Sequence, residues 1–136
     1  MKPKPKPPRS RILVVDDEPS VLLTYRMILE QQGYDVRVAA SSAEAKKSIE
    51  QEDIDLLLCD LSLEERHTGF EVIEYARKRQ PGACSVLLTG YATKDVSDQA
   101  EQDGIAVLFK PIDIQEFLST VGAQLRKRHE QSKKTG

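Results

Sequence analysis

Short apolar runs that end on a polar residue constrain the fold of this chain more than any other feature of its sequence. The clearest run extends from Leu56 to Cys59 and is followed directly by Asp60. A run of this length without polar alternation predicts a strand that is buried on both faces, as in a parallel sheet covered by helices. Because a buried carboxylate without partners is costly, we expect Asp60 at the carboxyl end of this strand, in the crevice where open α/β sheets bind ligands.

The rest of the chain alternates strand patterns with helix patterns. Four further strands are predicted at residues 12–15, 34–38, 84–88 and 105–109. The helices between them are bounded by start and stop signals, which stand at Pro19, Gly33, Ser41, Gly104 and Asp113. Five strand–helix units in strict alternation predict an α/β fold, a doubly wound five-stranded parallel sheet with helices on both faces.

Charge is divided unevenly along the 136 residues. Residues 1–11 and 126–136 hold ten Lys or Arg against one acid, a charge of +9, whereas residues 12–125 carry −11. We therefore expect a disordered basic Lys/Pro leader at 1–10, one folded domain at 11–127 and a polar C-terminal tail at 128–136, although the segment after 124 could also begin a linker helix. No aromatic residue interleaves either end, which argues against direct nucleic-acid binding.

Composition also indicates the cellular compartment in which the protein is found. No apolar run approaches the roughly 20 residues of a membrane span, and the basic N-terminus leads into no apolar signal segment, so we expect no membrane insertion and a cytoplasmic location. Cys59 and Cys84 both lie inside apolar strand patterns, where reduced core thiols are the expected reading.

Reactive polar side chains follow four of the five predicted strands. They are Asp16, Asp17, Asp60, Thr89 and Lys110. Because the carboxyl ends of parallel strands meet at one edge of a sheet, these side chains should converge. Three carboxylates repel one another unless a cation lies among them, and Mg²⁺ prefers such oxygen ligands. With a lysine and a hydroxyl beside it, this group would cradle a phosphoryl group and leave Asp60 as its nucleophile.

The same set of residues, in this order and at these intervals, resembles the receiver domain of two-component response regulators. The resemblance covers residues 11 to about 127 and implies a flavodoxin-like sheet of strand order 2-1-3-4-5. It implies that Asp60 accepts phosphate from a sensor histidine kinase or phosphotransfer protein. It also implies that Mg²⁺ is bound by Asp17, Asp60 and the backbone carbonyl of Ser62, with Asp16 acting through water. Lys110 would pair with phosphoryl oxygens, and Thr89 would bind one of them after phosphorylation.

The chain departs from the family pattern at two positions. An aromatic residue usually stands three residues before the lysine, where this chain has Val107, whose single stiff torsion cannot swing between buried and exposed states. Tyr91 or Phe109 could serve in part. The usual proline four residues after the acceptor is replaced by Glu64. In the same loop, His67 is expected to be a surface residue.

The leading function predicted from the sequence is therefore a Mg²⁺-dependent phosphorylation switch that is not an enzyme beyond its own phosphorylation and dephosphorylation. A stand-alone receiver would signal by contact with a downstream protein target, and pairing through the last helix would give a homodimer. Two alternatives stay open: an inert receiver-like interaction module, and a receiver fragment of a longer regulator with an output domain. A haloacid-dehalogenase-like phosphatase is disfavoured, because it needs a second aspartate where this chain has Ser62.

Overall fold

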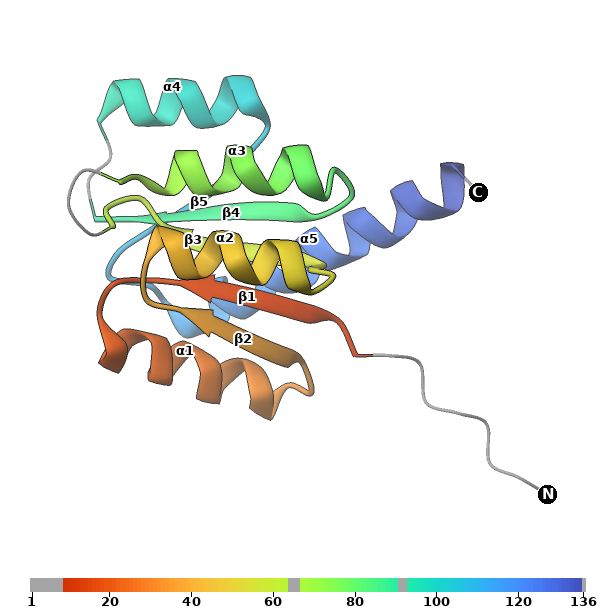
Figure 1. Ribbon diagram of the computed structural model, residues 1–136, viewed down its shortest axis with the longest axis horizontal. Coiled ribbons are helices and arrows are strands. Elements are labelled where there is room, and N and C mark those ends of the chain that lie inside the picture. Colours follow the sequence, from red (N-terminus) through yellow and green to blue (C-terminus); the bar gives the residue numbers. More distant parts are fainter. Residues whose placement is uncertain (1–8, 64–66, 91–92, 136) are drawn as a thin grey trace.

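The computed structural model describes residues 9–63, 67–90 and 93–135, the last seven of them by their backbone alone (Figure 1). Strands and helices alternate without exception through these residues. In chain order they are β1 (Arg11–Val15), α1 (Pro19–Gln31), β2 (Asp35–Ala39), α2 (Ser42–Gln51), β3 (Leu56–Asp60), α3 (Gly69–Arg79), β4 (Cys84–Thr89), α4 (Lys94–Asp103), β5 (Ala106–Phe109) and α5 (Ile114–Thr135).

The five strands form one sheet in which every pair of neighbours is parallel. Their order is β2-β1-β3-β4-β5, which confirms the predicted topology and leaves β2 and β5 as the two edges. In the register of the central strands, Val15 lies beside Cys59, and Asp60 lies beside Leu88. The residues that follow β1, β3, β4 and β5 therefore emerge at the same edge of the sheet.

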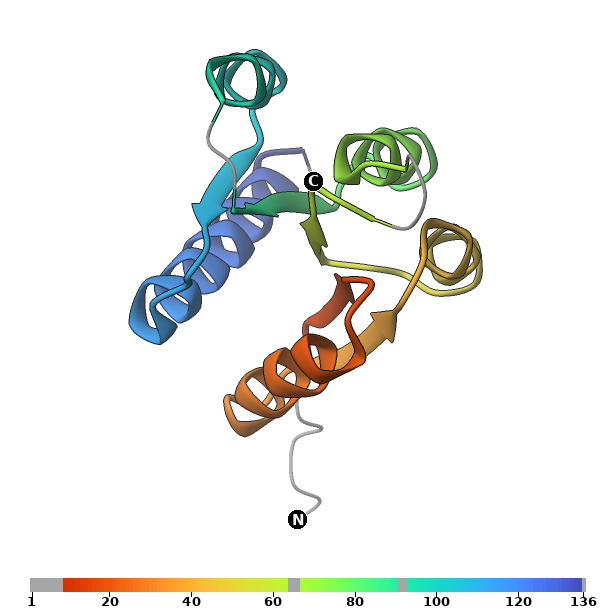
Figure 2. The same cartoon turned by 90° about the vertical axis from the view of Figure 1, so that its left-hand side faces the viewer.

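Helices cover both faces of the sheet, as Figure 2 shows end-on. One core cluster joins the sheet to α1 and α5 through residues such as Leu29 and Phe117. The other joins it to α2, α3 and α4 through residues such as Ile49, Ile73 and Ala100. All five residues of β3 are buried, as expected for the strand at the centre of a sheet that is covered on both faces.

The predicted start and stop signals of the helices form the expected capping interactions. The hydroxyl of Ser41 accepts a hydrogen bond from the backbone N–H of Glu44 at the start of α2, and Asp113 accepts one from Glu116 at the start of α5. Gly33 and Gly104 adopt positive φ angles of 92° and 67° just after α1 and α4. Strand β2 begins one residue later than predicted, because the N–H of Tyr34 still donates a hydrogen bond to the carbonyl of Leu29 in α1.

Helix α5 runs for 22 residues, past the boundary expected at residue 127, and projects beyond the body of the sheet (Figure 1). In this part of α5, Arg128 forms an ion pair with Asp55, directly before β3. Within the part of the chain that the structure describes, no helix combines the length and the apolar character needed to cross a membrane.

Candidate functional site

Three carboxylates converge at the carboxyl edge of the sheet. Asp16 and Asp17 follow β1, and Asp60 is the last residue of β3. Each offers an oxygen that lies within 4.8 Å of the others. Asp16 and Asp60 are buried, with exposed fractions of 1% and 9%, whereas Asp17 is exposed. The convergence that the sequence predicts is therefore present, and its donor set consists of hard oxygen ligands of the type that Mg²⁺ prefers.

Lys110 reaches into this acid cluster from the end of β5. Its Nζ lies 3.0 Å from Oδ2 of Asp60 and 3.3 Å from Oδ2 of Asp16. Burial acts to lower the pKa of Lys110, but the hydrogen bond and charge of Asp60, with those of Asp16, outweigh it and raise that pKa. Lys110 therefore stays protonated. One ammonium group faces three carboxylates, so the site keeps an excess of negative charge that a divalent cation would balance.

Burial also shifts the titration of Asp16. Burial raises its pKa, and the nearby charge of Asp60 acts in the same direction. The backbone N–H of Glu18, 2.9 Å from Oδ1, and the ammonium group of Lys110 oppose this rise but do not cancel it. An ionised Asp16 is thus held at a cost in stability, which a bound cation would offset.

The main chain around Asp60 is fixed on both sides. The N–H of Leu61 donates to the carbonyl of Leu88, and the N–H of Gly69 donates to the carbonyl of Leu61, each at 2.8 Å. The N–H of Ser62 donates to Oδ1 of Asp60 at 3.3 Å. A side chain at Gly69 would overlap the carbonyl oxygen of Asp60, so α3 can begin this close only with glycine.

Thr89 ends β4 with an exposed fraction of 1%, and its carbonyl accepts a hydrogen bond from the N–H of Lys110 at 2.8 Å. The peptide between Lys110 and Pro111 is cis. The threonine and the lysine are thus joined through the backbones of neighbouring strands, on the side of Asp60 away from β1. The sequence-predicted set of Asp16, Asp17, Asp60, Thr89 and Lys110 accordingly occupies one edge.

The residues at which the chain departs from the family pattern are described only in part. Val107 is half-buried and packs against the cluster beneath α2, α3 and α4, while Phe109 is 48% exposed. His67 lies on the surface with its Nδ1 2.9 Å from a carboxylate oxygen of Glu71. Glu64 and Tyr91 lie outside the described residues.

Tyr25 of α1 and Phe117 of α5 are two residues near the site that the sequence analysis did not identify. In the structure their rings stack, with centroids 5.1 Å apart. Burial raises the pKa of Tyr25, and the charges of Lys110, Asp16 and Asp60 also act on it. Tyr25 therefore lies within electrostatic reach of the acid cluster. No local signal could have shown this, because the contact joins two helices that are nearly a hundred residues apart.

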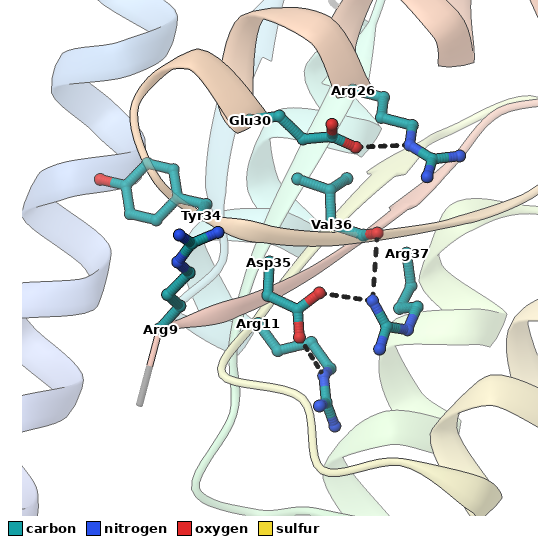
Figure 3. Close-up of a pocket in the computed structure, with 8 residues that line it drawn as sticks. All are labelled: Arg9, Arg11, Arg26, Glu30, Tyr34, Asp35, Val36 and Arg37. Atoms are coloured by element: carbon teal, nitrogen blue, oxygen red, sulfur yellow. Dashed lines mark hydrogen bonds and ion pairs between the residues drawn. The ribbon is translucent and has the colours of Figure 1, made fainter. Parts of the chain in front are cut away.

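A cavity of about 550 Å³ at the opposite, amino edge of the sheet also has many charged side chains (Figure 3). Its cations are largely paired within it: Arg26 with Glu30, and Arg11 with Asp35 at 3.0 Å. Arg37 also pairs with Asp35 and reaches Glu52 at 2.9 Å. This arrangement is a network of surface ion pairs on β1, β2 and α1, remote from the acid cluster.

Comparison with known proteins gives a consistent result. Residues 12–122 match the response regulator receiver domain family. The chain is 35% identical over 121 residues to the alginate biosynthesis transcriptional regulatory protein AlgB of Pseudomonas putida. The aligned residues cover 88% of this chain and 27% of AlgB. The chain thus spans about a quarter of the length of such curated relatives.

Two solved structures show the same arrangement. A CheY-like receiver domain protein from Methanospirillum hungatei JF-1 has 33% identity and a TM-score of 0.86, over 91% of this chain and 99% of that one. The beryllofluoride-activated NtrC4 receiver domain dimer has 28% identity and a TM-score of 0.80, over 87% and 98%. By its sequence and by the edge at which its acids meet Lys110, this chain belongs to the response regulator receiver domains.

Proposed function

We propose that the chain is a phosphorylation switch in which Asp60 accepts a phosphoryl group from a sensor histidine kinase or a phosphotransfer protein. One observation carries the proposal: the carboxylate of Asp60 ends the central strand at an open edge, 3.0 Å from the ammonium group of Lys110 and within 4.8 Å of two further acids. Phosphoryl transfer depends mainly on positioning and charge stabilisation, which this edge supplies.

Under this proposal, Asp17, Asp60 and the backbone carbonyl of Ser62 hold Mg²⁺, with Asp16 bound through water. A cation held by these residues would supply positive charge beside the phosphoryl oxygens. An oxygen of Asp60 forms the new bond to phosphorus as the donor's P–N bond breaks, and the histidine nitrogen leaves with the electron pair. Lys110 holds a phosphoryl oxygen by its charge, and the hydroxyl of Thr89 donates to another.

Phosphorylation replaces the single negative charge of the Asp60 carboxylate with a phosphoryl group that carries up to about two. We propose that Thr89 and Lys110 follow this charge inward and shift the surface formed by α4, β5 and α5 between two packings. That surface is suited to movement, because Ala100 is the one residue of α4 that is buried. The signal then passes by contact, either to a separate downstream protein or to an output domain such as those of the longer relatives. Pairing through α5 would give a homodimer.

We also propose that the chain catalyses only its own phosphorylation and dephosphorylation and turns over no external substrate. We propose a cytoplasmic location, because Cys59 and Cys84 are free thiols, which suit a reducing compartment.

Incubation with acetyl phosphate and Mg²⁺, followed by intact-mass measurement, tests the proposal. The expected result is an adduct with the mass of one phosphoryl group that is absent from Asp60→Asn and from wild-type protein kept in EDTA. Asp113→Asn serves as a matched control, because Asp113 is an exposed acid outside the cluster. An adduct that persists in Asp60→Asn would contradict the assignment of the acceptor.

A second candidate, an interaction module that keeps the pocket without using it, is favoured by Val107. Its side chain is packed against the core and cannot rotate as an aromatic residue could. The same experiment separates the two functions, provided that a histidine kinase donor is added as a further arm. If neither donor gives an adduct on folded protein, the inert module is the better account.

A further inference from the structure

Helix α4 has fewer attachments than the helices beside it. Ala100 is its one buried residue, and among the described residues no side chain of α4 forms a hydrogen bond or ion pair with another element. By contrast, α2 and α3 are joined by ion pairs of Lys46 with Glu71 and of Glu50 with Arg79. The docked position of α4 therefore depends on apolar packing, and small changes in that packing should move it.

A groove of about 540 Å³ separates α4 from α3. Phe70 and Ile73 line it from α3, Asp103 lines it from α4, and Ile105 lines it from the turn after α4. The backbone N–H of Ile105 donates to the carbonyl of Ala100 at 2.8 Å, so this turn is tied to the helix. Because α4 is not packed tightly against α3, α4 and the turn can move together without displacing α3.

The sheet beside this turn contains a buried hydroxyl. Ser85, the second residue of β4, has an exposed fraction of 7%, and its Oγ is buried with no hydrogen-bond partner among the described residues. Side chains alternate along a strand, and Leu87 belongs to the core cluster beneath α2, α3 and α4, so Ser85 points to that face. In the sheet register Leu57 lies beside Ser85 on β3, and Ile105 lies on its other side, directly before β5.

An unpaired hydroxyl in these apolar surroundings destabilises the docked arrangement. A buried polar atom without a partner has lost its hydrogen bonds to water and has none in their place. If α4 and the turn at Ile105 move away from the sheet, water can reach this part of the core and bond to the hydroxyl of Ser85. The hydroxyl therefore shifts the equilibrium between docked and displaced α4 toward the displaced state.

We propose that Ser85 is a conformational device built into the sheet, whose unpaired hydroxyl keeps α4 easy to displace. The docked helix stays the major state, and the displaced helix is a minor state of the unphosphorylated protein. A partner or a phosphoryl group that favours the displaced helix then needs less differential affinity to select it. The device is a property of the fold and does not depend on phosphoryl transfer to Asp60.

Amide hydrogen exchange of ¹⁵N-labelled protein, without Mg²⁺ or a phosphodonor, tests the proposal. Exchange is measured at several low urea concentrations, because a local opening exposes little surface and depends only weakly on urea. The amides of α4 and of Ile105 are expected to exchange through such an opening. Ser85→Ala should slow their exchange by about fivefold or more, since the cost of an unpaired buried hydroxyl is removed. Ser48→Ala removes a half-exposed hydroxyl from α2 and should change it by less than about twofold.

Ser85→Cys, measured in reducing buffer, is the deciding variant if alanine leaves a gap that loosens the core. It keeps nearly the volume of serine, and its thiol behaves as a small apolar group. Slower exchange confined to α4 and its turn supports the proposal. Unchanged or faster exchange of α4 in Ser85→Cys, or equal slowing at all amides, would overturn it, because the hydroxyl would then not act on the docking of α4. Because no phosphodonor is present, failure of phosphorylation at Asp60 would leave these results unaffected.

Discussion

Arg128 of α5 pairs with Asp55 at the amino end of β3, with 3.0 Å between Nη1 and Oδ1. The other carboxylate oxygen of Asp55 accepts the backbone N–H of Arg11 at 2.7 Å. One carboxylate, directly before the central strand, therefore contacts both the first strand and the far part of the last helix.

Asp55→Ala should lower the free energy of unfolding by about 1–3 kcal/mol, because it leaves the half-buried N–H of Arg11 without its partner. Arg128→Ala should cost only about 0–1 kcal/mol, as expected for a partly exposed ion pair. Urea unfolding of both single variants and the double variant measures the coupling between them. Equal costs for the two single variants would show that the ion pair, and not the backbone bond, is the main contribution of Asp55.

Gln80 closes the carboxyl end of α2 with one side chain. Its Nε2 donates to the carbonyls of Ile49 and Glu52, at 2.6 and 2.7 Å, and its Oε1 accepts the N–H of the buried Ile54 at 2.7 Å. Gln80→Ala should therefore cost about 2–3 kcal/mol in unfolding free energy. Gln115→Ala, at an exposed position of α5, is the control and should stay within about 0.5 kcal/mol of wild type.

Glu71 gives a pH dependence of stability. Hydrogen bonds from Lys46 and His67 lower its pKa to about 2. Because the folded-state value lies below the unfolded one, the stabilisation is complete above the ordinary pKa of a glutamate and is lost as pH falls toward 2. Glu71→Gln should cost less than about 1 kcal/mol at pH 7, since the Glu71 side chain is 40% exposed. Urea unfolding at pH 7 and pH 3 should show the two proteins converging at the lower pH.

Asp16 should have the opposite effect on stability. Burial raises its pKa in the folded protein, so the fold loses stability as pH rises from the ordinary aspartate pKa through the raised value. Asp16→Asn should therefore be more stable than the metal-free wild type at pH 7, and this advantage should shrink as the pH is lowered. Thermal unfolding of both proteins in EDTA, from pH 7 down to the ordinary pKa of an aspartate, measures this difference in stability. A variant that is less stable at pH 7 would show that the ion pair with Lys110 outweighs the cost of burial.

Asp17 separates metal binding from folding. It is exposed, so Asp17→Asn should leave the unfolding free energy within about 0.5 kcal/mol of wild type. If Asp17 is a ligand, the dissociation constant for Mg²⁺ should rise by about tenfold or more, since one anionic donor is lost. Calorimetric titration with MgCl₂ gives this value. Asp113→Asn provides the control for loss of a single surface charge.

The sequence was sufficient to predict the edge at which the site forms. Asp60 and Lys110 lie 50 residues apart, yet each follows a short apolar run, and parallel strands carry such residues to a common edge. The helix boundaries at Ser41 and Gly104 were equally predictable, because capping depends on side chains a few residues away.

Contacts between elements that lie far apart in the chain could not be predicted in this way. The side chain of Gln80 caps a helix that ends 29 residues earlier, at Gln51, and nothing in its own segment shows this. Arg128 lies one residue beyond the expected domain boundary at 127 and still docks onto β3. Polar residues near a chain end resemble a solvated tail until the packing of the helix on the sheet is known.

Gly69 has a further consequence for the proposed switch. Because no Cβ separates them, the first turn of α3 rests directly against the peptide carbonyl of Asp60, and a methyl group would force the two apart. The contact between Asp60 and α3 is thus made by backbone atoms, and not by a side chain that could rotate. A displacement of the Asp60 peptide should therefore move the start of α3 directly. We expect α3 to shift before any element whose movement depends on side-chain rearrangement.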